Sequence, residues 1–534
     1  MLVSVYGNGG GITRRFKVRF VPSGEQVVVN EGVLISDAAR EAGVVIKLPC
    51  NGSGRCGRCY VNISKMDGSC YVKTLACQTP VEGDTDVRVS LDEGEVIACA
   101  DHRRIKVDDL SPIVRSKTSS YGLAVDIGTT TVAVSVMDLN NGSEVYGAAG
   151  YNTQGMRGDD VLSRIEYAQD GGTEELRKLV IDTINDLIHT FGEDTKDIVA
   201  AYISGNTVMT HLFLGIDPSP IRRPPYEPVV REKEISGKES GLDIREDARV
   251  ICMPSPAAYV GGDVTSDLIN SGMDLSDELS LLIDVGTNGE VALGDKDVMM
   301  ICSSSAGPAF EGGKMTSGMM ARPGAIDSFR INDKGEFEYT VITGTEPKGI
   351  CGSGLIDILA HLSLNGLIDK KGKFTDKAVT GTIDGNKVLT IAKGVHISED
   401  DIRNAVMTKA AIYSAASSMV RGLGVSMDDI GRIYIAGGFG NFINAENAIS
   451  IGLFPDIPRE RFTYLGNASL AGAKQALLSA SARSRISELF KRMTYVDLGS
   501  DPTFSDEYMS SLFIPHTDMS RFPTYAKRVR NGGL

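Results

Sequence analysis

One short pattern occurs twice in the chain, and it limits the possible folds more than any other feature. The segments LAVDIGTTTVAVSVMDL (123–139) and LLIDVGTNGEVALGD (281–295) share an apolar strand, an aspartate, a Gly-Thr turn and a second strand. A solenoid would repeat about every 20–50 residues, so this spacing excludes one. The repeat instead predicts two similar α/β halves, each opening with a strand–turn–strand hairpin. Each half continues with helices and further strands, at 198–206 in the first and 432–440 in the second.

The rest of the 534-residue chain divides around this repeat. Residues 1–92 are typical of short strands around one helix, and the polar, charged residues 93–118 are expected to form a linker. The alternation of strands and helices predicts two lobes of one α/β domain, 119–280 and 281–482. For residues 483–534 we expect a C-terminal extension made of a strand or two and an extended tail.

Composition narrows the functional classes. Hydrophobic residues make up 42% of the chain and the mean hydropathy is −0.05, values typical of a globular protein. No apolar stretch approaches the roughly 18–20 residues of a membrane span, and the N-terminus lacks a secretory signal, so we expect a cytoplasmic protein without a membrane partner. The net charge of −14 argues against nucleic-acid binding.

The two Asp-x-Gly-Thr turns are suited to phosphate. Backbone N–H groups and hydroxyls in such a turn form a nest for phosphate oxygens, and glycine lets a phosphate approach the backbone. An aspartate at the end of the preceding strand can hold Mg²⁺ directly or through water. The candidate residues are Asp126, Gly128, Thr129 and Thr130 in the first turn, and Asp284, Gly286, Thr287, Asn288 and Gly289 in the second. We therefore predict that two facing hairpins clamp the phosphates of a nucleotide.

Three further glycine-rich segments extend this prediction. In IAGGFGN (435–441), Gly437 and Gly438 follow a strand and would let an adenosine lie flat against the backbone. Gly352 and Ser353 open an amphipathic helix whose N-terminus could face an anion, although they could equally form an ordinary loop. In CSSSAGPAFEGG, Glu311 is a candidate general base for an attacking water, and a solvated loop glutamate is the alternative. Cys302 and Cys351 are expected to be core or loop residues.

The first Gly-Thr turn, the second Gly-Thr turn and the late Gly-Gly turn follow one another along the chain as do the motifs of the ASKHA superfamily, which includes actin, sugar kinases and the Hsp70 ATPase. This part of the chain therefore resembles that superfamily. The resemblance covers about 119–482 and implies ATP and Mg²⁺ in an interlobe cleft. It would place ISGNTVM (203–209) and MPSPAAYVGGD (253–263) near the hinge or the wall of that cleft.

The N-terminal region carries a cysteine loop, LPCNGSGRCGRCYVNIS (48–64), with the spacing C-x5-C-x2-C. Cys50, Cys56 and Cys59 would supply three of the four thiolates that a 2Fe-2S cluster needs. The candidates for the fourth ligand are Cys77, Cys70 and Cys99. Zinc is disfavoured because the first 101 residues contain no histidine, and a C-x2-C redox disulfide would leave Cys50 unexplained.

Residues 1–91 resemble a plant-type or adrenodoxin-like ferredoxin, which implies a β-grasp fold and a 2Fe-2S cluster. The segment LACQT (75–79) matches the setting of that family's last cysteine and favours Cys77 over Cys70. The spacing between the third and the fourth cysteine is shorter than in adrenodoxin.

The fusion as a whole resembles the ATP-dependent reductive activators of corrinoid-dependent methyltransferases. DIGTTT, ISGNT, DVGTNGE, SSSAGPAFEGG, GICGSGLID and IAGGFGN carry this resemblance. It implies ATP-coupled transfer of one electron from the cluster to Co(II) of a partner corrinoid protein. An upstream low-potential electron donor is expected to reduce the cluster. A homodimer is compatible with this function. Two other functions stay open: an electron-injecting activator of the radical dehydratase type, and a redox-sensing ASKHA chaperone or regulator. A sugar kinase would leave the ferredoxin unexplained.

Overall fold

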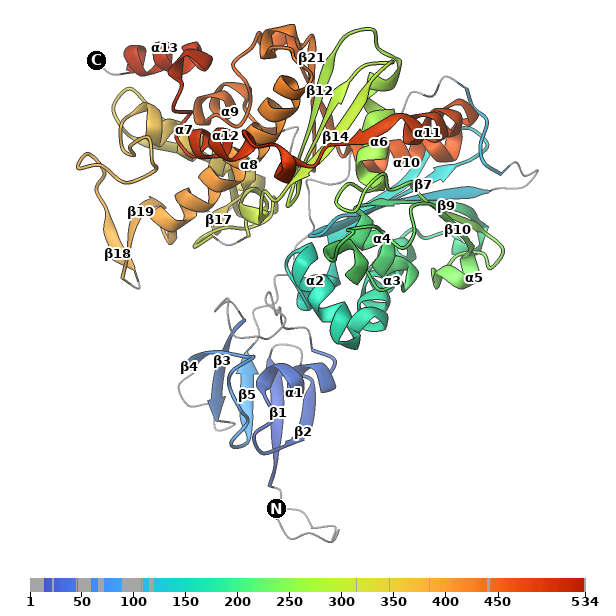
Figure 1. Cartoon of the computed structure of the whole chain (residues 1–534). Helices are drawn as coiled ribbons and strands as arrows, with labels where there is room; N and C mark the ends of the chain where they lie inside the picture. Colours follow the sequence, from blue (N-terminus) through green and yellow to red (C-terminus); the bar gives the residue numbers. More distant parts are fainter. Residues whose placement is uncertain are drawn as a thin grey trace. The chain divides into compact units, whose positions relative to one another are not determined.

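The computed structural model describes residues 14–21, 24–44, 46, 59–65, 72–88, 107, 109–114, 120–313, 315–344, 346–383, 385–438 and 442–532. Contacts divide the chain into two compact units. The first unit comprises Met1–Glu93 and Thr153–Leu176, and the second comprises Gly94–Asn152 and Arg177–Leu534. Figure 1 shows the chain coloured from its N-terminus to its C-terminus.

The first unit contains a small sheet with the strand order β2-β1-β5-β3-β4. Its elements are β1 (Arg15–Val21), β2 (Gln26–Asn30), α1 (Ile35–Glu41), β3 (Tyr60–Lys65), β4 (Val72–Leu75) and β5 (Thr85–Arg88). β1 pairs antiparallel with β2 and parallel with β5, so the sheet is mixed. Val18 and Phe20 of β1 are fully buried and pack with Ile35 of the helix and Val87 of β5. A mixed sheet covered by one helix is the β-grasp expected for this part of the chain.

Thr153–Leu176 also groups with the first unit, although the sequence pattern places it in the first α/β lobe. It contains α2 (Val161–Tyr167), a π-helical turn at Ala168–Gly172 and the start of α3 (Thr173–His189). Asp160 caps α2 by accepting a hydrogen bond from the backbone N–H of Ser163 at 2.9 Å. Buried Arg157 pairs with Glu175 at 2.5 Å and so ties the two ends of the segment together.

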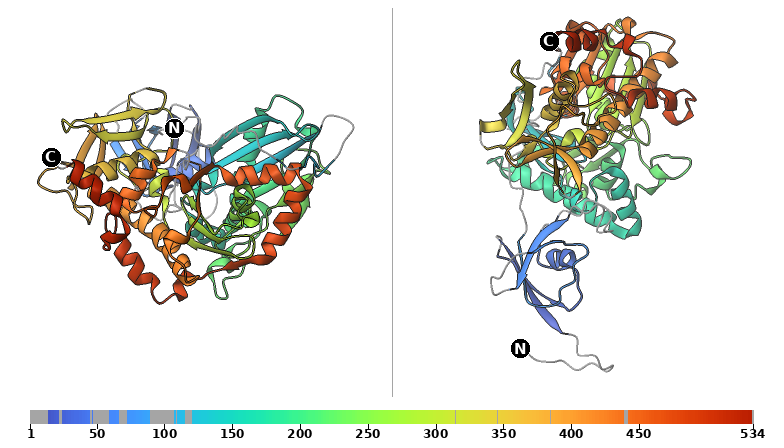
Figure 2. Two further views of the ribbon diagram at one scale, coloured as in Figure 1. Left: turned by 90° about the horizontal axis from the view of Figure 1, so that it is seen from above. Right: turned by 90° about the vertical axis from the view of Figure 1, so that its left-hand side faces the viewer.

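The second unit is built on two six-stranded sheets (Figure 2). The first sheet has the order β10-β11-β9-β6-β7-β8. Its strands are β6 (Tyr121–Ile127), β7 (Thr131–Asp138), β8 (Glu144–Tyr151), β9 (Ile198–Gly205), β10 (Lys233–Ser236) and β11 (Arg249–Cys252). The hairpin β6–β7 is antiparallel, whereas β9 runs parallel to β6 and β11 runs parallel to β9. Two short helices, α4 (Thr207–Leu214) and α5 (Gly237–Ser240), connect these strands.

The second sheet repeats this pattern in the order β22-β21-β12-β13-β14-β23. Its strands are β12 (Ser280–Val285), β13 (Gly289–Gly294), β14 (Met299–Ser304), β21 (Arg432–Ala436), β22 (Phe462–Gly466) and β23 (Met493–Tyr495). β12–β13 is the antiparallel hairpin, β21 runs parallel to β12, and β22 runs parallel to β21. Five strands of each sheet therefore correspond in order and direction, which confirms the duplication that the sequence repeat predicts.

A helix that follows β22 of the second sheet in the chain packs on the first sheet. α10 (Ala468–Leu478) lies against β6, β9 and α6 (Gly262–Ser271), and α11 (Ala480–Arg492) follows it (Figure 1). A Cβ on Gly472 of α10 would lie 2.3 Å from the carbonyl oxygen of Ser266, so glycine is required for α10 and α6 to cross this closely. The chain thus returns from the second sheet to the first before it ends.

The second half carries additional structure around its sheet. Two three-stranded sheets consist of β15 (Ala325–Ile331), β16 (Phe337–Val341) and β17 (Gly349–Ile350), and of β18 (Gly381–Ile383), β19 (Asn386–Ala392) and β20 (Val395–Ser398). The helices are α7 (Gly352–Leu364), α8 (Glu399–Gly422) and α9 (Ala445–Ile451). Buried residues of α7, α8, β12 and β21 form one continuous core.

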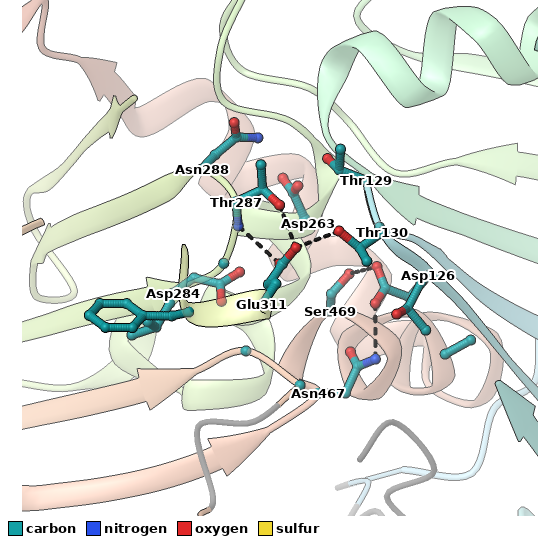
Figure 3. A pocket seen from close by; sticks show the side chains of 18 of the residues that line it. Asp126, Thr129, Thr130, Asp263, Asp284, Thr287, Asn288, Glu311, Asn467 and Ser469 are labelled. Atoms are coloured by element: carbon teal, nitrogen blue, oxygen red, sulfur yellow. Dashed lines mark hydrogen bonds between the residues drawn. The ribbon is translucent and has the colours of Figure 1, made fainter. Parts of the chain in front are cut away.

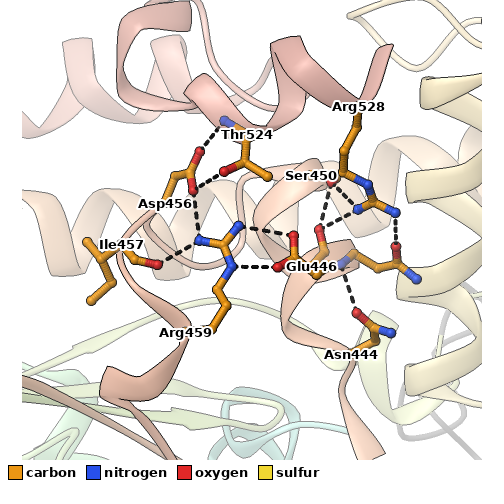
Figure 4. Close-up of polar contacts among 9 residues, drawn as sticks. Asn444, Glu446, Ser450, Asp456, Ile457, Arg459, Thr524 and Arg528 are labelled. Carbon is orange, nitrogen blue, oxygen red and sulfur yellow. Dashed lines mark hydrogen bonds and ion pairs between the residues drawn. The ribbon is translucent and has the colours of Figure 1, made fainter. Parts of the chain in front are cut away.

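The prediction of an extended C-terminal tail is wrong. Residues 483–532 contain the predicted strand, β23, but also most of α11, then α12 (Phe504–Ser511) and α13 (Pro523–Gly532). Polar contacts hold α13 in place: Asp456 accepts hydrogen bonds from the backbone N–H and the hydroxyl of Thr524, both at 2.7 Å (Figure 4). Arg528 donates to the carbonyl of Glu446 and to Ser450. These tertiary contacts, absent from the local sequence, stabilise a helix that the polar composition conceals.

Candidate nucleotide cleft and cysteine site

The turns of the two hairpins face one pocket (Figure 3). All but two of the residues predicted for the nucleotide site line it: Asp126, Gly128, Thr129, Thr130, Asp284, Gly286, Thr287, Asn288, Glu311, Gly352, Gly437 and Gly438. The sequence pattern therefore brings together side chains that are far apart along the chain.

Gly289 and Ser353 do not line the pocket. A Cβ on Gly289 would lie 2.7 Å from Ile412 of α8, so this glycine allows close packing of the hairpin on that helix. Ser353 is buried, and its hydroxyl donates to the carbonyl of Asp327 at 2.8 Å. Both residues thus stabilise elements next to the pocket without lining it.

The first turn is held by its neighbours in the first sheet. A Cβ on Gly128 would lie 2.6 Å from the carbonyl oxygen of Thr131, so the turn requires glycine. Asn206, which follows β9 and caps α4, donates from its amide to the hydroxyl of Thr129 at 3.3 Å. ISGNTVM (203–209) thus reaches the cleft wall through Asn206, which lines the pocket.

Glu311 connects the two turns. Its carboxylate accepts hydrogen bonds from the hydroxyls of Thr130 and Thr287, both at 2.5 Å, and from the backbone N–H of Thr287 at 3.0 Å. It ends a short 3-10 turn, Pro308–Glu311, that approaches the second hairpin. The solvated-loop alternative does not describe this residue, because three donors from both halves of the unit orient its carboxylate (Figure 3).

Asp126 is bound by the N-terminus of α10. Its carboxylate accepts from the amide of Asn467 at 2.9 Å and from the hydroxyl of Ser469 at 2.7 Å. Asn467 is also the N-cap of the helix and accepts from the N–H of Leu470 at 2.8 Å. Burial raises the pKa of Asp126, and the two donors act in the opposite direction.

Three acidic residues complete the floor of the pocket: Asp263, Asp267 and Glu290. Asp263 is the last residue of MPSPAAYVGGD (253–263), the segment expected near the hinge or the cleft wall, whereas Asp267 and Glu290 were not among the residues predicted from the sequence. Asp267 is 1% exposed and Glu290 is 4% exposed; both oxygens of Asp267 and Oε1 of Glu290 lack a hydrogen-bond donor among the described residues. Two signals could have found them: the Gly-Gly-Asp that opens α6, and the position of Glu290 directly opposite Asp284 in the hairpin.

The pocket concentrates negative charge. Among the described residues that line it there are six carboxyl groups and no lysine, arginine or histidine. Burial, followed by repulsion from neighbouring carboxylates, raises the pKa of Asp263 to about 7 and that of Asp284 to about 8. The described carboxylate, histidine and thiolate groups do not include three that converge on a preformed metal site.

Gly437 brings the third glycine motif against the second hairpin. Its φ is +107°, and a Cβ there would lie 2.6 Å from the carbonyl oxygen of Val285 and 2.9 Å from the carboxylate of Asp284. Both features require glycine. Phe310, Met319 and Met320 add an apolar surface to the pocket. Residues 439–441 of this motif lie outside the described part of the chain.

The cysteine loop is described only in part. Cys50, Cys56, Cys70 and Cys99 lie outside the described residues. Cys59, which precedes β3, and Cys77, which follows β4, are both buried, and their sulfur atoms lie 3.2 Å apart. Cys302 and Cys351 are buried in the second unit, as the sequence predicts for core residues.

Comparison with known families supports the two-part architecture. The model of the 2Fe-2S iron-sulfur cluster binding domain matches residues 19–82. The RACo middle region matches 121–276, and the C-terminal domain of RACo, described as the ASKHA domain, matches 278–526. These matches confirm the predicted fold class, a ferredoxin followed by an ASKHA domain of two duplicated lobes.

The alignments with individual relatives cover most of the chain. Corrinoid activation enzyme RamQ of Eubacterium limosum is 29% identical, with 91% of this chain and 97% of the relative aligned. The Co(II) methylated amine-specific corrinoid protein reductase of Methanosarcina barkeri is 26% identical over 73% of this chain and 76% of its own. A solved structure named reductive activator for corrinoid, iron-sulfur protein aligns with a TM-score of 0.74 and 34% identity, over 95% of this chain and 100% of its own. In the part of the chain that the structure describes, helices of membrane-spanning length and apolarity are absent.

Proposed function

Because the chain belongs to the family of reductive activators of corrinoid proteins, we propose that it transfers one electron from a 2Fe-2S cluster to Co(II) of a corrinoid protein. The transfer regenerates Co(I) for methyl transfer and is coupled to ATP hydrolysis. One observation carries this proposal: a ferredoxin fold and an ASKHA cleft occur in one chain that aligns almost end to end with a reductive activator.

ATP is proposed to bind between the two hairpins. The Gly-Thr turns would bind its phosphates, and Gly437 and Gly438 would lie against its adenosine. The acidic floor fits Mg²⁺, because both carboxylate oxygens of buried Asp267 and Oε1 of buried Glu290 have no hydrogen-bond donor among the described residues. Mg²⁺ usually keeps several waters and takes one or two protein carboxylates together with phosphate oxygens. We propose Asp126 and Asp284 as its primary ligands.

Glu311 is proposed to orient the water that attacks the γ-phosphate. Its carboxylate already lies between the two phosphate-binding turns, where Thr130 and Thr287 orient it. Binding of ATP would draw these hydroxyls toward phosphate oxygens and free the carboxylate oxygens to accept a hydrogen bond from water. Because the two threonines belong to different halves of the unit, this exchange of hydrogen bonds would change contacts in both halves when ATP binds.

Cys50, Cys56, Cys59 and Cys77 are proposed to hold the cluster, which supplies a one-electron carrier when bound. The 3.2 Å between the sulfurs of Cys59 and Cys77 supports this set, because two thiolates on one iron must come close together. Both cysteines lie at the same end of the β3–β4 pair, where Tyr60 is opposite Leu75.

The partner is proposed to be the corrinoid protein of a methyltransferase system. An upstream low-potential electron donor is part of the proposal, while the cytoplasmic location and the homodimer stay predictions from the sequence. The dehydratase-type activator and the chaperone are not favoured, because the named relatives act on corrinoid proteins.

Reconstitution tests the proposal directly. Anaerobically purified protein is mixed with a corrinoid protein in the cob(II)alamin state, a low-potential reductant and Mg-ATP, and the Co(I) absorption is followed. We expect Co(I) to form faster with ATP than without it, and the Asp126→Ala variant to lose this acceleration. Equal rates with and without ATP would contradict the coupling, and a colourless, zinc-containing protein would contradict the cluster.

A further inference from the structure

A short part of the interdomain segment is bound to the second unit. The backbone N–H groups of Ser111 and Ile113 donate to the carbonyls of Leu478 and Leu477, at 2.8 and 2.9 Å, at the C-terminal end of α10. Ile113 and Val114 pack against the apolar core between α10 and the first sheet. The sequence predicts only a linker here, whereas these residues are fastened to the junction of α10 and α11.

Asp109 is the polar anchor of this segment. Its carboxylate accepts hydrogen bonds from the hydroxyls of Ser479 and Ser481 and from the backbone N–H of Ala480. These donors form the N-terminus of α11, where the helix dipole also favours an anion. Arg483, one turn further along α11, donates to the carbonyl of Ser111 at 2.8 Å. Two side chains thus hold the linker on the helix junction.

The opposite end of α10 lies in the nucleotide cleft. Asn467 and Ser469, at its N-terminus, bind the carboxylate of Asp126. The helix Ala468–Leu478 has 11 residues, so its two ends are about 16 Å apart at 1.5 Å per residue. A rigid helix therefore has a cleft residue at one end and the linker anchor at the other.

The anchor also sets the length of the connection to the ferredoxin. From Arg88, the end of β5, to Val107 the chain has 18 intervening residues (89–106), whereas without the anchor 31 residues (89–119) would precede Ser120. At the maximal extension of about 3.5 Å per residue, this difference changes the reach from about 65 Å to about 110 Å. Effective concentration falls as about the −3/2 power of length, so release of the anchor would lower it about twofold.

We propose that Asp109 is a positioning residue that fixes the point where the ferredoxin tether leaves the ATPase, and that α10 links this point to the nucleotide cleft. Binding of Mg-ATP changes the hydrogen bonds of Asp126 with Asn467 and Ser469, which shifts α10 and with it the anchor. The part of this inference that concerns electron delivery rests on the proposed function; the part that concerns the linker does not.

Hydrogen–deuterium exchange tests the linker part on the full-length protein, with Mg-ATP as the ligand. In wild type we expect slow exchange at the amides of Ser111 and Ile113, with a change of at least twofold when Mg-ATP is added. Asp109→Ala and Arg483→Ala should remove this protection, whereas Asp428→Asn, an exposed carboxylate away from the linker, should leave it intact. Unprotected amides in wild type, protection that survives in Asp109→Ala, or protection that Mg-ATP leaves unchanged would each overturn the proposal.

Electron delivery gives the second test. Asp109→Ala should keep the cluster spectrum and the basal ATPase rate of wild type but reduce the corrinoid protein about twofold more slowly at limiting partner. Insertion of 13 Gly/Ser residues within 89–106 should have the same effect, because it restores the length of the unanchored tether. Wild-type rates in both variants would overturn the role of the anchor. Failure of wild type itself to form Co(I) would instead count against the proposed function and leave the exchange test to decide the anchor.

Discussion

The hydroxyl of Thr130 donates a hydrogen bond to the carboxylate of Glu311, 181 residues further along the chain. Thr130 lies in the first hairpin turn and Glu311 lies beside the second, so this contact joins the two duplicated halves across the cleft. Thr287 makes the equivalent contact from the second turn. One carboxylate thus contacts both Gly-Thr turns. Under the proposed function, an ATP that accepts hydrogen bonds from the two hydroxyls would change the contacts between the halves.

This relationship predicts a specific defect for Glu311→Gln. The amide keeps the size of the side chain but is a far weaker base than a carboxylate, so ATP hydrolysis should slow about 100-fold or more while ATP still binds. ATPase turnover and ATP affinity, measured separately on one preparation, check this expectation. Glu346→Gln, an exposed loop glutamate, is the matched control and should behave as wild type. A Glu311→Gln variant with normal turnover would exclude Glu311 as the general base for the attacking water.

Gly437 predicts a second, separable effect. An alanine there would combine a positive φ with contacts of 2.6 Å to a carbonyl and 2.9 Å to Asp284. Gly424 has a φ of +75° but open space around its Cβ position, so Gly424→Ala measures backbone strain alone. We expect Gly424→Ala to cost about 1 kcal/mol in the free energy of unfolding, and Gly437→Ala to cost clearly more.

Nucleotide binding separates the two glycines further. Calorimetric titration with Mg-ATP should show affinity near wild type for Gly424→Ala and a loss of at least tenfold for Gly437→Ala, because the added methyl displaces the second hairpin. If both variants bound ATP equally well, the third glycine motif would have no part in the nucleotide site.

The sequence predicts the hairpins of this protein better than its helices. The repeat around Asp126 and Asp284 identifies both turns, because a Gly-Thr turn between two apolar strands is a local pattern. Glu290 lies opposite Asp284 in the register of the hairpin, so the two side chains point to the same face of the sheet. The residue type alone does not indicate that Glu290 is buried. The repeat thus predicts the two Gly-Thr turns that line the pocket and misses part of its acidic floor.

The features that the sequence does not predict depend on long-range contacts. The close packing of α10 on α6 depends on Gly472 meeting Ser266, two residues far apart in sequence. α13 depends on Asp456 and Glu446, and the linker anchor on the meeting of Asp109 with Ser479. None of these pairs produces a periodic pattern in the sequence. Local patterns therefore predict an extended tail for 483–534 and a linker without tertiary contacts for 93–118.

The cysteine pair predicts which residue completes the cluster. Since the sulfur atoms of Cys59 and Cys77 are 3.2 Å apart, Cys77→Ala should abolish the 2Fe-2S absorption of the anaerobically purified protein. Cys70→Ala and Cys99→Ala are the matched controls, and both should keep the spectrum and the iron content. A protein that loses its cluster in Cys70→Ala but keeps it in Cys77→Ala would reverse the assignment.

The acidic floor predicts how stability depends on pH. The pKa values of Asp263 and Asp284 are raised to about 7 and about 8, so between about pH 4 and pH 8 the folded protein holds protons that the unfolded chain has lost. The contribution of these groups to the free energy of unfolding therefore falls as the pH rises through this window. Mg-ATP should flatten this dependence, because a cation favours the ionised carboxylates.

Thermal unfolding between pH 5 and pH 9 can isolate this contribution. Asp284→Asn removes one of the titrating groups, so the nucleotide-free variant should lose less thermal stability than wild type as the pH rises from 5 to 8. Asp428→Asn, which is exposed and far from the cleft, should follow the wild-type curve. Parallel curves for wild type and Asp284→Asn would mean that the carboxyl group of Asp284 is already ionised in the folded protein at pH 5. In that case a cation would have to balance the ionised carboxylates of the acidic floor in the absence of ATP.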